Sequence, residues 1–359
     1  MSHRILLTGA SGYLGGTLLA RWSRHHLPPY SRLYAAVRTE QQVNALRNHY
    51  SAMDSGAEVA PLILDNIKDQ AVVRDLIVSH EITIVLFLID AFEVGAQCCF
   101  IRALAEVKSM TGREVHFLHT SGAKVFSSHA GAPTDRLLFD DEEDLYKIQK
   151  EQVPNIPPVQ TAINTNNTII ELCESLDVKG YIFVPCIVYG EGEGFGNPIS
   201  IQTVAIVSAA QEAGRVYSVD SGKPTWPVCH VLDNTALYLA IVNSILTGKN
   251  SDQKKCRYYL AASGTIAWVD LYRAIGEALT KRGVISDNVV EQADEDAMDR
   301  MAKGLKTPRE LVALQLGGAL TARSGEKLGW KPQFGPTHIL QTADDEVERI
   351  LAYQRSRDQ

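Results

Sequence analysis

Residues 4–22 read RILLTGASGYLGGTLLARW, and this stretch decides the fold class. A short apolar run comes first, a glycine-rich turn follows, and leucines at helical spacing come after it. In such a turn the first glycine permits a tight bend, the second lets a diphosphate approach the backbone, and the third lets the helix pack against the strand. The free N–H groups at the start of the helix attract a phosphate.

The stretch therefore predicts a strand, a loop and a helix that together bind a dinucleotide. The candidate contacts are Gly9, Ser11, Gly12, Tyr13, Leu14 and Gly15. The alternative is that the glycines only make a tight turn from strand to helix.

Four further apolar runs follow, and segments of helical length separate most of them. The runs lie at residues 33–37, 59–64, 82–89 and 114–119. Unbroken apolar strands that alternate with helices indicate a parallel sheet with both faces covered. The predicted fold class is therefore α/β, with a doubly wound parallel sheet. Ligands of such sheets bind beyond the carboxyl ends of the strands, so the residues that end these runs should face one crevice.

The residue that ends the second strand predicts the cofactor. A carboxylate there binds a ribose 2′-hydroxyl, whereas an arginine pairs with a 2′-phosphate. Arg38 holds this position, and Glu40 lies two residues on, so NADP is favoured and NAD stays an alternative. Asp65, with Asn66 beside it, ends the third strand and is a candidate contact for the adenine. The other interpretation is that Asp65 caps the helix that follows.

The rest of the chain divides into an excursion and a second lobe. Residues 126–161 carry an acidic run at 140–144 and prolines at 154, 157 and 158, which indicates a surface excursion. A strand at 180–185 resumes the sheet, and after about residue 196 helices mix with short strands. We expect a dinucleotide-binding domain at 1–190 and a smaller C-terminal lobe at 191–359 that binds substrate, part of which can return to the first domain.

Five motifs are spread over almost the whole chain. They are TGASGYLG at 8–15, HTSGA at 119–123, VYGEG at 188–192, HVLDN at 230–234 and LGWKP at 328–332. Together they resemble the short-chain dehydrogenase/reductase superfamily, in its extended branch of NAD-dependent epimerase/dehydratase proteins, and especially fungal members of that branch. The resemblance implies a Rossmann fold, a nicotinamide dinucleotide and a small-molecule substrate. Members of the branch often form homodimers, so a homodimer is a candidate assembly.

The resemblance also implies a catalytic Ser or Thr after the fifth strand, and a Tyr and a Lys four residues apart on the next helix. In the family the lysine lowers the pKa of the tyrosine, which exchanges a proton with the substrate oxygen. Here Gly122 takes the place of the hydroxyl residue, with Ser121 beside it. Tyr146 lies 24 residues after Gly122, near the usual spacing, and Lys150 follows four residues later. Ser121, Tyr146 and Lys150 are therefore the candidate catalytic residues.

A second alignment conflicts with the first. Counted back from the strand at 180–185, the Tyr position falls at residues 158–159 and the Lys position at 162–163, where apolar residues stand. Proline within a helix also removes a hydrogen bond, and prolines follow Lys150 closely. Either an insertion follows a genuine Tyr146 and Lys150 pair, or the pair lies by chance on an exposed loop helix.

Other polar residues are candidates in the same crevice. Lys124 follows the fifth strand and can reach a phosphate or an acidic substrate group. Asp90 ends the fourth strand and can act as a base or cap the segment from residue 92 onward. Asparagines at 164, 166 and 167 stand where the catalytic helix is expected, and an amide can orient a carbonyl but cannot take up a proton near neutral pH. Tyr189 and His230 are expected to be structural.

The loop at 190–196 and the segment 226–230 are expected to form substrate walls, and their small and aromatic residues favour a mostly apolar ligand. No cluster of Arg or Lys here suits a nucleotide-sugar diphosphate. We expect an NADP(H)-dependent oxidoreductase that acts on a carbonyl or alcohol of a small, mostly apolar molecule. The alternatives are a non-redox isomerase, dehydratase or cyclase with a degenerate triad, and a binding protein that senses NADP(H).

Composition limits the partners of the chain. Its 359 residues include 35 Lys and Arg against 42 Asp and Glu, a net charge of −7, so nucleic acid is not an expected partner. No apolar stretch reaches the length of a membrane span, and the first residues do not form a secretory signal, so we expect a cytoplasmic protein. The six cysteines show no CxxC pair, so neither disulfides nor a metal site are expected.

Overall fold

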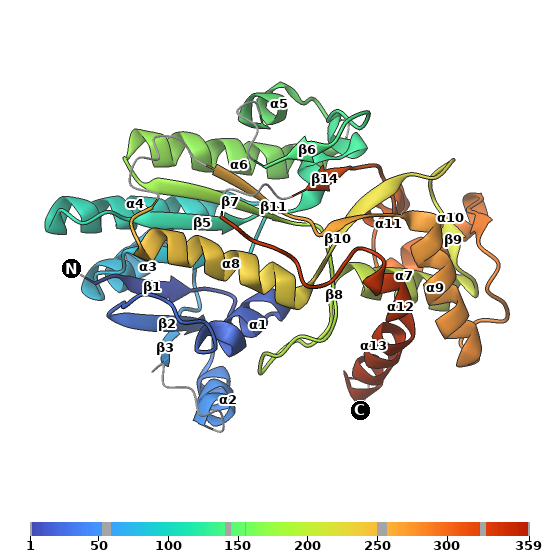
Figure 1. Ribbon diagram of the computed structural model, residues 1–359, viewed down its shortest axis with the longest axis horizontal. Coiled ribbons are helices and arrows are strands. Elements are labelled where there is room, and N and C mark those ends of the chain that lie inside the picture. The colour runs from blue at the N-terminus through green and yellow to red at the C-terminus, as the bar shows by residue number, and fades with distance from the viewer. Residues whose placement is uncertain are drawn as a thin grey trace.

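The computed structural model describes residues 2–51, 59–140, 145–154, 156–249, 257–323 and 328–357 (Figure 1). Within these residues the main sheet has seven parallel strands in the order β11-β7-β5-β4-β1-β2-β3. The strands are β1 (Arg4–Leu7), β2 (Arg32–Val37), β3 (Val59–Ile63), β4 (Ile84–Phe87), β5 (His116–Thr120), β7 (Lys179–Pro185) and β11 (Arg257–Ala261). The order reverses at β1, which pairs with β2 on one side and with β4 on the other. This reversal places a crevice at the carboxyl ends of β1 and β4.

Alternate residues of the strands enter two different cores. Leu6 and Val85 belong to the core on one face of the sheet, and their neighbours Ile5 and Leu86 belong to the core on the other face. All four side chains are fully buried. Because both faces are apolar, helices must cover both, and the doubly wound α/β prediction is confirmed.

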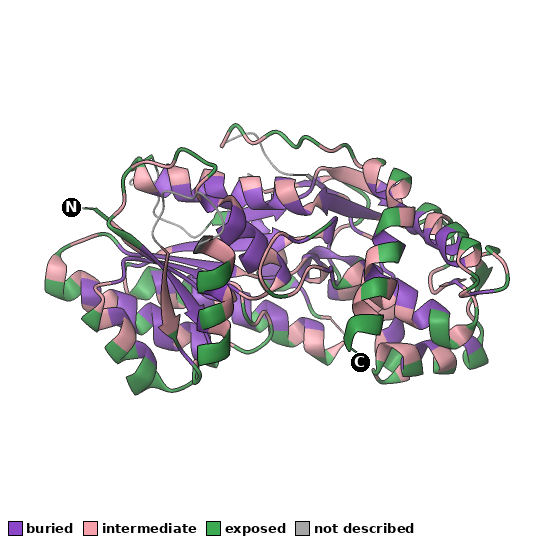
Figure 2. Ribbon diagram, turned by 90° about the horizontal axis from the view of Figure 1, so that it is seen from below, coloured by how far each residue is buried: buried purple, intermediate pink, exposed green. Residues whose placement is uncertain are grey.

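Two sets of helices cover the sheet. The first set shares a core with Ile5 and comprises α1 (Tyr13–Trp22), α2 (Glu40–Ser51) and α8 (Val231–Leu246). The second set shares a core with Leu6 and comprises α3 (Gln70–Ser79), α4 (Gly95–Thr111) and α6 (Pro157–Ser175). Figure 2 shows the strands buried at the centre, while the outer faces of these helices are exposed. Both α8 and β11 come from beyond residue 191, yet they complete the sheet domain.

The excursion between β5 and α6 contains little regular secondary structure. It holds two turns of 3-10 helix, η1 (Ala123–Phe126) and η2 (Ser128–Ala130), then β6 (Leu138–Phe139) and α5 (Leu145–Glu151), which lies outside α6 (Figure 1). Most of the predicted acidic run, residues 141–144, lies outside the described residues. Pro157 and Pro158 do not interrupt a helix, since they occupy the first positions of α6, where no N–H is needed.

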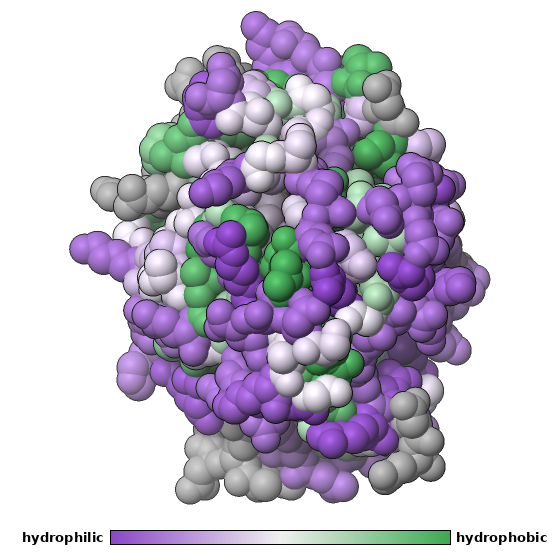
Figure 3. Space-filling view, turned by 90° about the vertical axis from the view of Figure 1, so that its right-hand side faces the viewer, coloured by the Kyte–Doolittle hydropathy of each residue, from purple (hydrophilic) through white to green (hydrophobic). Residues whose placement is uncertain are grey.

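The C-terminal lobe joins small sheets to a group of helices. A three-stranded sheet in the order β12-β10-β8 contains β8 (Ile187–Tyr189), β10 (Thr225–His230) and β12 (Gly264–Ala267). Two short pairs add β9 (Tyr217–Ser218) with β13 (Glu291–Gln292), and β14 (Ala322–Arg323) with β6. The remaining elements are α7 (Gln202–Ala213), α9 (Trp268–Lys281), α10 (Glu295–Leu305), η3 (Arg309–Leu311), α11 (Val312–Leu316), α12 (His338–Gln341) and α13 (Ala343–Arg357). The end of the molecule that this lobe forms is mainly hydrophilic, with apolar side chains in small separate groups (Figure 3).

Five cysteines in the described part of the chain are free thiols, and Cys256 lies outside the described residues. Burial raises the pKa of the Cys173 and Cys229 thiols, as it does for any thiol held away from water. No helix among the described residues has the length and apolar composition to cross a membrane. Nor do those residues bring three or more metal-binding side chains together.

The fold predicts a strong difference between two glycines. A Cβ at Gly15 would lie 2.3 Å from the Gly9 carbonyl oxygen, whereas a Cβ at Gly122 would meet nothing within 4 Å. Gly15→Ala should therefore lower the free energy of unfolding by about 1–3 kcal/mol, because helix α1 must move away from β1. Gly122→Ala should leave it within roughly 0.5 kcal/mol. Urea unfolding of the two variants measures the difference, and equal midpoints would contradict this account of the β1–α1 contact.

Candidate functional site

The loop between β1 and α1 has the geometry of an anion site. Gly9 has φ of +70°, which a glycine adopts without strain, and its carbonyl accepts the N–H of Gly12 at 2.9 Å. Gly12 is the N-cap of α1, so no side chain caps the helix, and the first turn has no acidic residue. The first N–H groups of α1 are therefore available to a phosphate at the carboxyl edge of the sheet.

A second glycine-rich loop, residues 190–198 after β8, packs on the β1–α1 loop. The Tyr13 hydroxyl donates to the Gly190 carbonyl at 2.7 Å, and the Asn197 N–H donates to the Ser11 carbonyl at 3.0 Å. A Cβ at Gly196 would lie 2.0 Å from the Ser11 oxygen, so only glycine permits this approach. One side of the loop predicted as a substrate wall therefore contacts the dinucleotide loop itself.

Arg38 stands at the carboxyl end of β2, the position predicted to select the coenzyme. It follows β2 directly and is exposed, and its backbone N–H donates to Gln42 Oε1 at 2.7 Å. Gln42 Nε2 in turn lies 3.4 Å from Ser11 Oγ, so the start of α2 is tied to the glycine loop. Arg38 thus follows the end of β2 directly, and its backbone is bound to the side chain of Gln42. Gln42 was not among the predicted residues, although its place four residues after Arg38, on the first turn of a helix, is a usable signal.

The residues that end β3 and β4 have different surroundings. Asp65 and Asn66 are exposed after β3, and the N-cap of α3 is Asp69, whose carboxylate accepts the N–H of Ala71 at 2.9 Å. The interpretation of Asp65 as a helix cap is therefore wrong, and its predicted contact with adenine stays a prediction. Asp90 Oδ1 accepts the N–H of Phe92 at 2.7 Å, so this carboxylate caps the turn before α4.

The end of β5 is open at the position of the family's hydroxyl residue. Gly122 has extended backbone, with φ of −156°, and a side chain there would project into empty space. Ser121 is 5% exposed, its N–H donates to the Phe183 carbonyl at 2.8 Å, and its hydroxyl has no partner in the described part of the chain. Among the described residues this hydroxyl is therefore left with its donor and acceptor capacity unused.

Tyr146 and Lys150 lie on α5 and both bind Glu171 of α6. The Tyr146 hydroxyl donates to Glu171 Oε1 at 3.1 Å, and Lys150 Nζ donates to the same oxygen at 2.9 Å. Since α6 runs from the carboxyl edge of the sheet toward the start of β7, Glu171, fourteen residues after Pro157, lies roughly 20 Å along the helix from that edge. The structure therefore does not bring this pair together with Ser121.

The electrostatics of the pair also differ from those of a proton donor. Burial and the hydrogen bond to Glu171 raise the pKa of Tyr146, whereas a catalytic tyrosine needs a lowered pKa. The same hydrogen bond to Glu171 raises the pKa of Lys150. The carboxylate stabilises the phenol and the ammonium in their protonated forms.

Helix α6 occupies the place of the family's catalytic helix, directly before β7. Its buried face carries Val159 and Ile163, which agrees with the second alignment and offers no group that exchanges a proton. Thr165 Oγ1 donates to the Phe92 carbonyl at 2.6 Å and so fixes α6 beside the turn after β4. Asn166 is fully buried, and neither polar atom of its side chain has a partner among the described residues.

Lys124, which was expected at the coenzyme, turns instead into the C-terminal lobe. Its Nζ donates to the Gly317 carbonyl at 2.6 Å and stands 4.1 Å from the centre of the Trp226 ring. Burial lowers the pKa of Lys124 to about 7, and the Asp220 carboxylate opposes this shift. Trp226 is 2% exposed, so it belongs to the core of the lobe and is not an open substrate wall.

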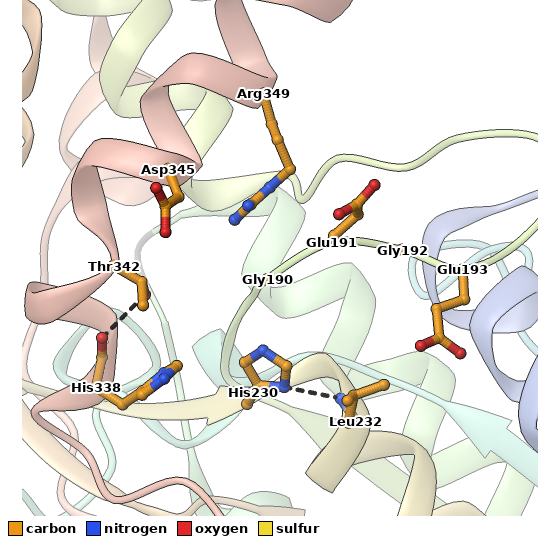
Figure 4. Close-up of a pocket in the computed structure, with 10 residues that line it drawn as sticks. All are labelled: Gly190, Glu191, Gly192, Glu193, His230, Leu232, His338, Thr342, Asp345 and Arg349. Atoms are coloured by element: carbon orange, nitrogen blue, oxygen red, sulfur yellow. Dashed lines mark hydrogen bonds between the residues drawn. The ribbon is translucent and has the colours of Figure 1, made fainter.

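A cavity of about 300 Å³ lies on the other side of the loop after β8, between this loop, the start of α8, and α12 with α13 (Figure 4). Ionisable side chains dominate its lining, among them Glu191, His230, His338, Asp345 and Arg349. His230 Nδ1 accepts the Leu232 N–H at 3.2 Å and so caps α8, and burial lowers the pKa of His230 to about 4. The wall of this cavity is therefore polar, contrary to the apolar wall expected for residues 190–196.

Known proteins share this chain's sequence pattern and fold. The model of the NAD dependent epimerase/dehydratase family matches residues 5–253. A search of curated proteins gives no match. Among solved structures, the dTDP-glucose 4,6-dehydratase of Bacillus anthracis in complex with NAD is 13% identical, with a TM-score of 0.58 over 97% of this chain and 96% of that one.

Two other solved structures are similar to the same degree. The UDP-glucose 4-epimerase of Bifidobacterium longum, with NAD+ and UDP, is 14% identical, with a TM-score of 0.58 over 98% of each chain. A yeast methylglyoxal/isovaleraldehyde reductase with NADPH is 11% identical, with a TM-score of 0.58 over 98% of this chain and 99% of that one. At such identities the likeness shows the fold, and three different activities share it. Since the family model covers well over half of the sequence, this chain belongs to the NAD dependent epimerase/dehydratase family.

Proposed function

We propose that this protein is an NADP(H)-dependent enzyme that acts on a carbonyl or alcohol carbon of a small, mostly apolar molecule. The observation that carries the proposal is the position of Arg38, exposed at the end of β2 beside the Ser11 and Gln42 pair, with the uncapped start of α1 next to it. An arginine there suits a 2′-phosphate, and free N–H groups suit a diphosphate. The yeast reductase of the same fold is complexed with NADPH, which supports the choice of coenzyme.

Each candidate residue would bind a different part of the coenzyme or the substrate. The N–H groups of α1 would hold the diphosphate, Arg38 the 2′-phosphate, and Asp65 the adenine, while the Ser121 hydroxyl would supply a hydrogen bond at the end of β5. A bound nicotinamide supplies or accepts a hydride. Ile89 and Phe92 are 46% and 53% exposed just beyond β4, so the crevice offers an apolar wall to a substrate.

A second candidate follows from the surroundings of α6. Gly122, Val159 and Ile163 replace the three groups that handle a proton in the family, and Tyr146 with Lys150 is engaged by Glu171. These observations favour a non-redox isomerase, dehydratase or cyclase that still holds the coenzyme, or a protein that senses NADP(H).

The coenzyme proposal predicts the effect of removing Arg38. Arg38→Ala should weaken NADPH binding about 10- to 100-fold and leave NADH binding within about twofold, because only NADPH carries the phosphate that the guanidinium holds. Titration calorimetry with both coenzymes measures this. Arg47→Ala, an exposed arginine farther along α2, is the matched control and should change neither affinity. Failure of the wild-type protein to bind either coenzyme would overturn the proposal.

The surroundings of the Tyr146 and Lys150 pair predict the result of a conservative change. Tyr146→Phe removes one hydrogen bond to Glu171 at a partly exposed site, so turnover of any substrate should change less than about twofold. A loss of about 100-fold or more, the effect expected for a proton donor, would show that α5 brings the phenol to the crevice during catalysis. Lys150→Met in the same assay tests the partner residue.

A further inference from the structure

The cavity beside the loop after β8 has a volume of about 300 Å³ and lies between this loop, the start of α8, and helices α12 and α13 (Figure 4). Such a volume far exceeds the space of one water molecule and reaches the lower end of the range for small-molecule sites. Among the described residues that line the cavity, none belongs to β1, α1 or the turn between them. The cavity is therefore separate from the crevice proposed to hold the coenzyme.

The walls of this cavity are fixed by their own contacts. Gly190 donates its N–H to Glu346 Oε2 at 3.1 Å, and Glu346 is 3% exposed. His230 Nδ1 accepts the Leu232 N–H at 3.2 Å, and the centres of the His230 and Phe334 rings lie 4.0 Å apart. A Cβ at Gly190 would lie 2.4 Å from His230 Nε2, so the loop passes over this imidazole only with glycine there. A ligand would therefore enter a shape that exists before it binds, which lowers the cost of binding.

Two side chains in the cavity have unused hydrogen-bond donors. Arg349 Nη2 donates to Glu346 Oε2 at 2.6 Å, and the other N–H groups of this guanidinium have no partner among the described residues. Burial lowers the pKa of His230 to about 4, so its ring is neutral near pH 7. Because Nδ1 accepts a hydrogen bond, the neutral ring carries its hydrogen on Nε2, which also lacks a partner there. In Figure 4 the Arg349 guanidinium extends from α13 into the space above the His230 ring.

A carboxylate without a partner faces the same space. Asp345 lies on the first turn of α13, is exposed, and has neither a hydrogen bond nor an ion pair in the described part of the chain. Figure 4 shows its carboxylate pointing from α13 in the direction of the histidines. The other acids differ, because Glu193 is paired with Arg21 and the carboxylate of Glu191 points away from the histidines. Asp345 therefore leaves one negative charge of the cavity uncompensated.

These donors and this carboxylate together suit one kind of ligand. A simple anion would accept from Arg349 and His230 but would also face the charge of Asp345. A simple cation would pair with Asp345, but it would face the guanidinium and leave the donors unused. A molecule with both a carboxylate and an ammonium group gives each set its own partner and brings no net charge into the cavity.

We propose that this cavity binds a free α-amino acid. The carboxylate of the amino acid accepts hydrogen bonds from Arg349 and from His230 Nε2, and its ammonium group donates to Asp345. Leu232 and the faces of the His230 and His338 rings remain for the side chain of the amino acid. The inference goes beyond the proposed function and does not depend on it, because no residue of the coenzyme crevice takes part.

Binding measurements on the full-length protein test the inference. A thermal-shift screen of the common L-amino acids finds the tightest ligand, and titration calorimetry then measures its affinity. At least one amino acid should bind with a Kd below about 1 mM. Acetate has only the carboxylate and propylamine only the ammonium group, so each should bind at least about tenfold more weakly. The inference fails if no amino acid binds, or if acetate or propylamine binds as tightly as the best amino acid.

Two matched substitutions on α13 locate the site. Asp345→Asn removes the partner of the ammonium group and should weaken binding of the amino acid at least about tenfold. The same variant should bind acetate as tightly as the wild-type protein or more tightly, because acetate no longer faces a negative charge. Glu348→Gln changes an exposed acid that pairs with Arg282, and it should alter neither affinity by more than about twofold. Equal effects of the two substitutions would overturn the inference.

A third variant tests the other end of the ligand. Arg349→Lys keeps a positive charge beside Glu346 but loses the planar set of donors, so binding of the amino acid should fall at least about fivefold. Unchanged affinity in this variant would contradict the assignment of the carboxylate. NADPH affinity is measured on the same wild-type sample. A protein that binds NADPH but no amino acid keeps the proposed function and loses this inference, and the reverse result keeps the inference alone.

Discussion

The contact between Gly15 and the Gly9 carbonyl sets the geometry on which the rest of the site depends. Because neither residue has a side chain, α1 starts close to the end of β1 and its first N–H groups face the carboxyl edge of the sheet. The same close packing lets the backbone of the loop after β8 pass over the loop between β1 and α1. Gly194 packs on Gly16, and Gly196 packs on Ser11, so that the loop after β8 is seated directly on the dinucleotide loop. A change in either loop must therefore be accommodated by the other.

That second loop links the turn between β1 and α1 to the C-terminal lobe. It ends near α7, and its Gly190 N–H donates to Glu346 of α13 at 3.1 Å. Glu346 is 3% exposed and also accepts a hydrogen bond from Thr203 of α7 at 2.8 Å. One buried carboxylate thus joins the loop, α7 and α13. The polar cavity beside the loop lies at the same junction, which places its charged lining next to the backbone that covers the turn between β1 and α1.

Two lysines show how surroundings decide the chemistry of one residue type. Lys150 is exposed and paired with Glu171, so it keeps its proton firmly. Lys124 is enclosed by indole rings and a carbonyl, so desolvation works against its charge. The Tyr-x-x-x-Lys spacing in the sequence predicts Lys150 as the catalytic lysine. Lys124 is two residues past the position where the family has its hydroxyl group, and packing of the lobe, rather than sequence spacing, gives it its properties.

The sequence by itself predicted six of the seven strands of the main sheet, the glycine loop and the family, because the apolar runs and the spacing of Gly9, Gly12 and Gly15 are local properties of the chain. Strand β11 was not predicted and came only from the tertiary structure. The sequence also placed Arg38 and Asp65 at strand ends, since a strand end follows from where an apolar run stops. Only the tertiary structure decided which residues stand at the family's Tyr and Lys positions, because two alignments of the sequence differed by about twelve residues. Tyr146 contacts α6, Lys124 contacts the C-terminal lobe, and the loop after β8 contacts the β1–α1 loop. Each of these contacts joins segments that are far apart in the sequence. Such contacts depend on how the helices and the lobe pack, which the order of residues does not reveal.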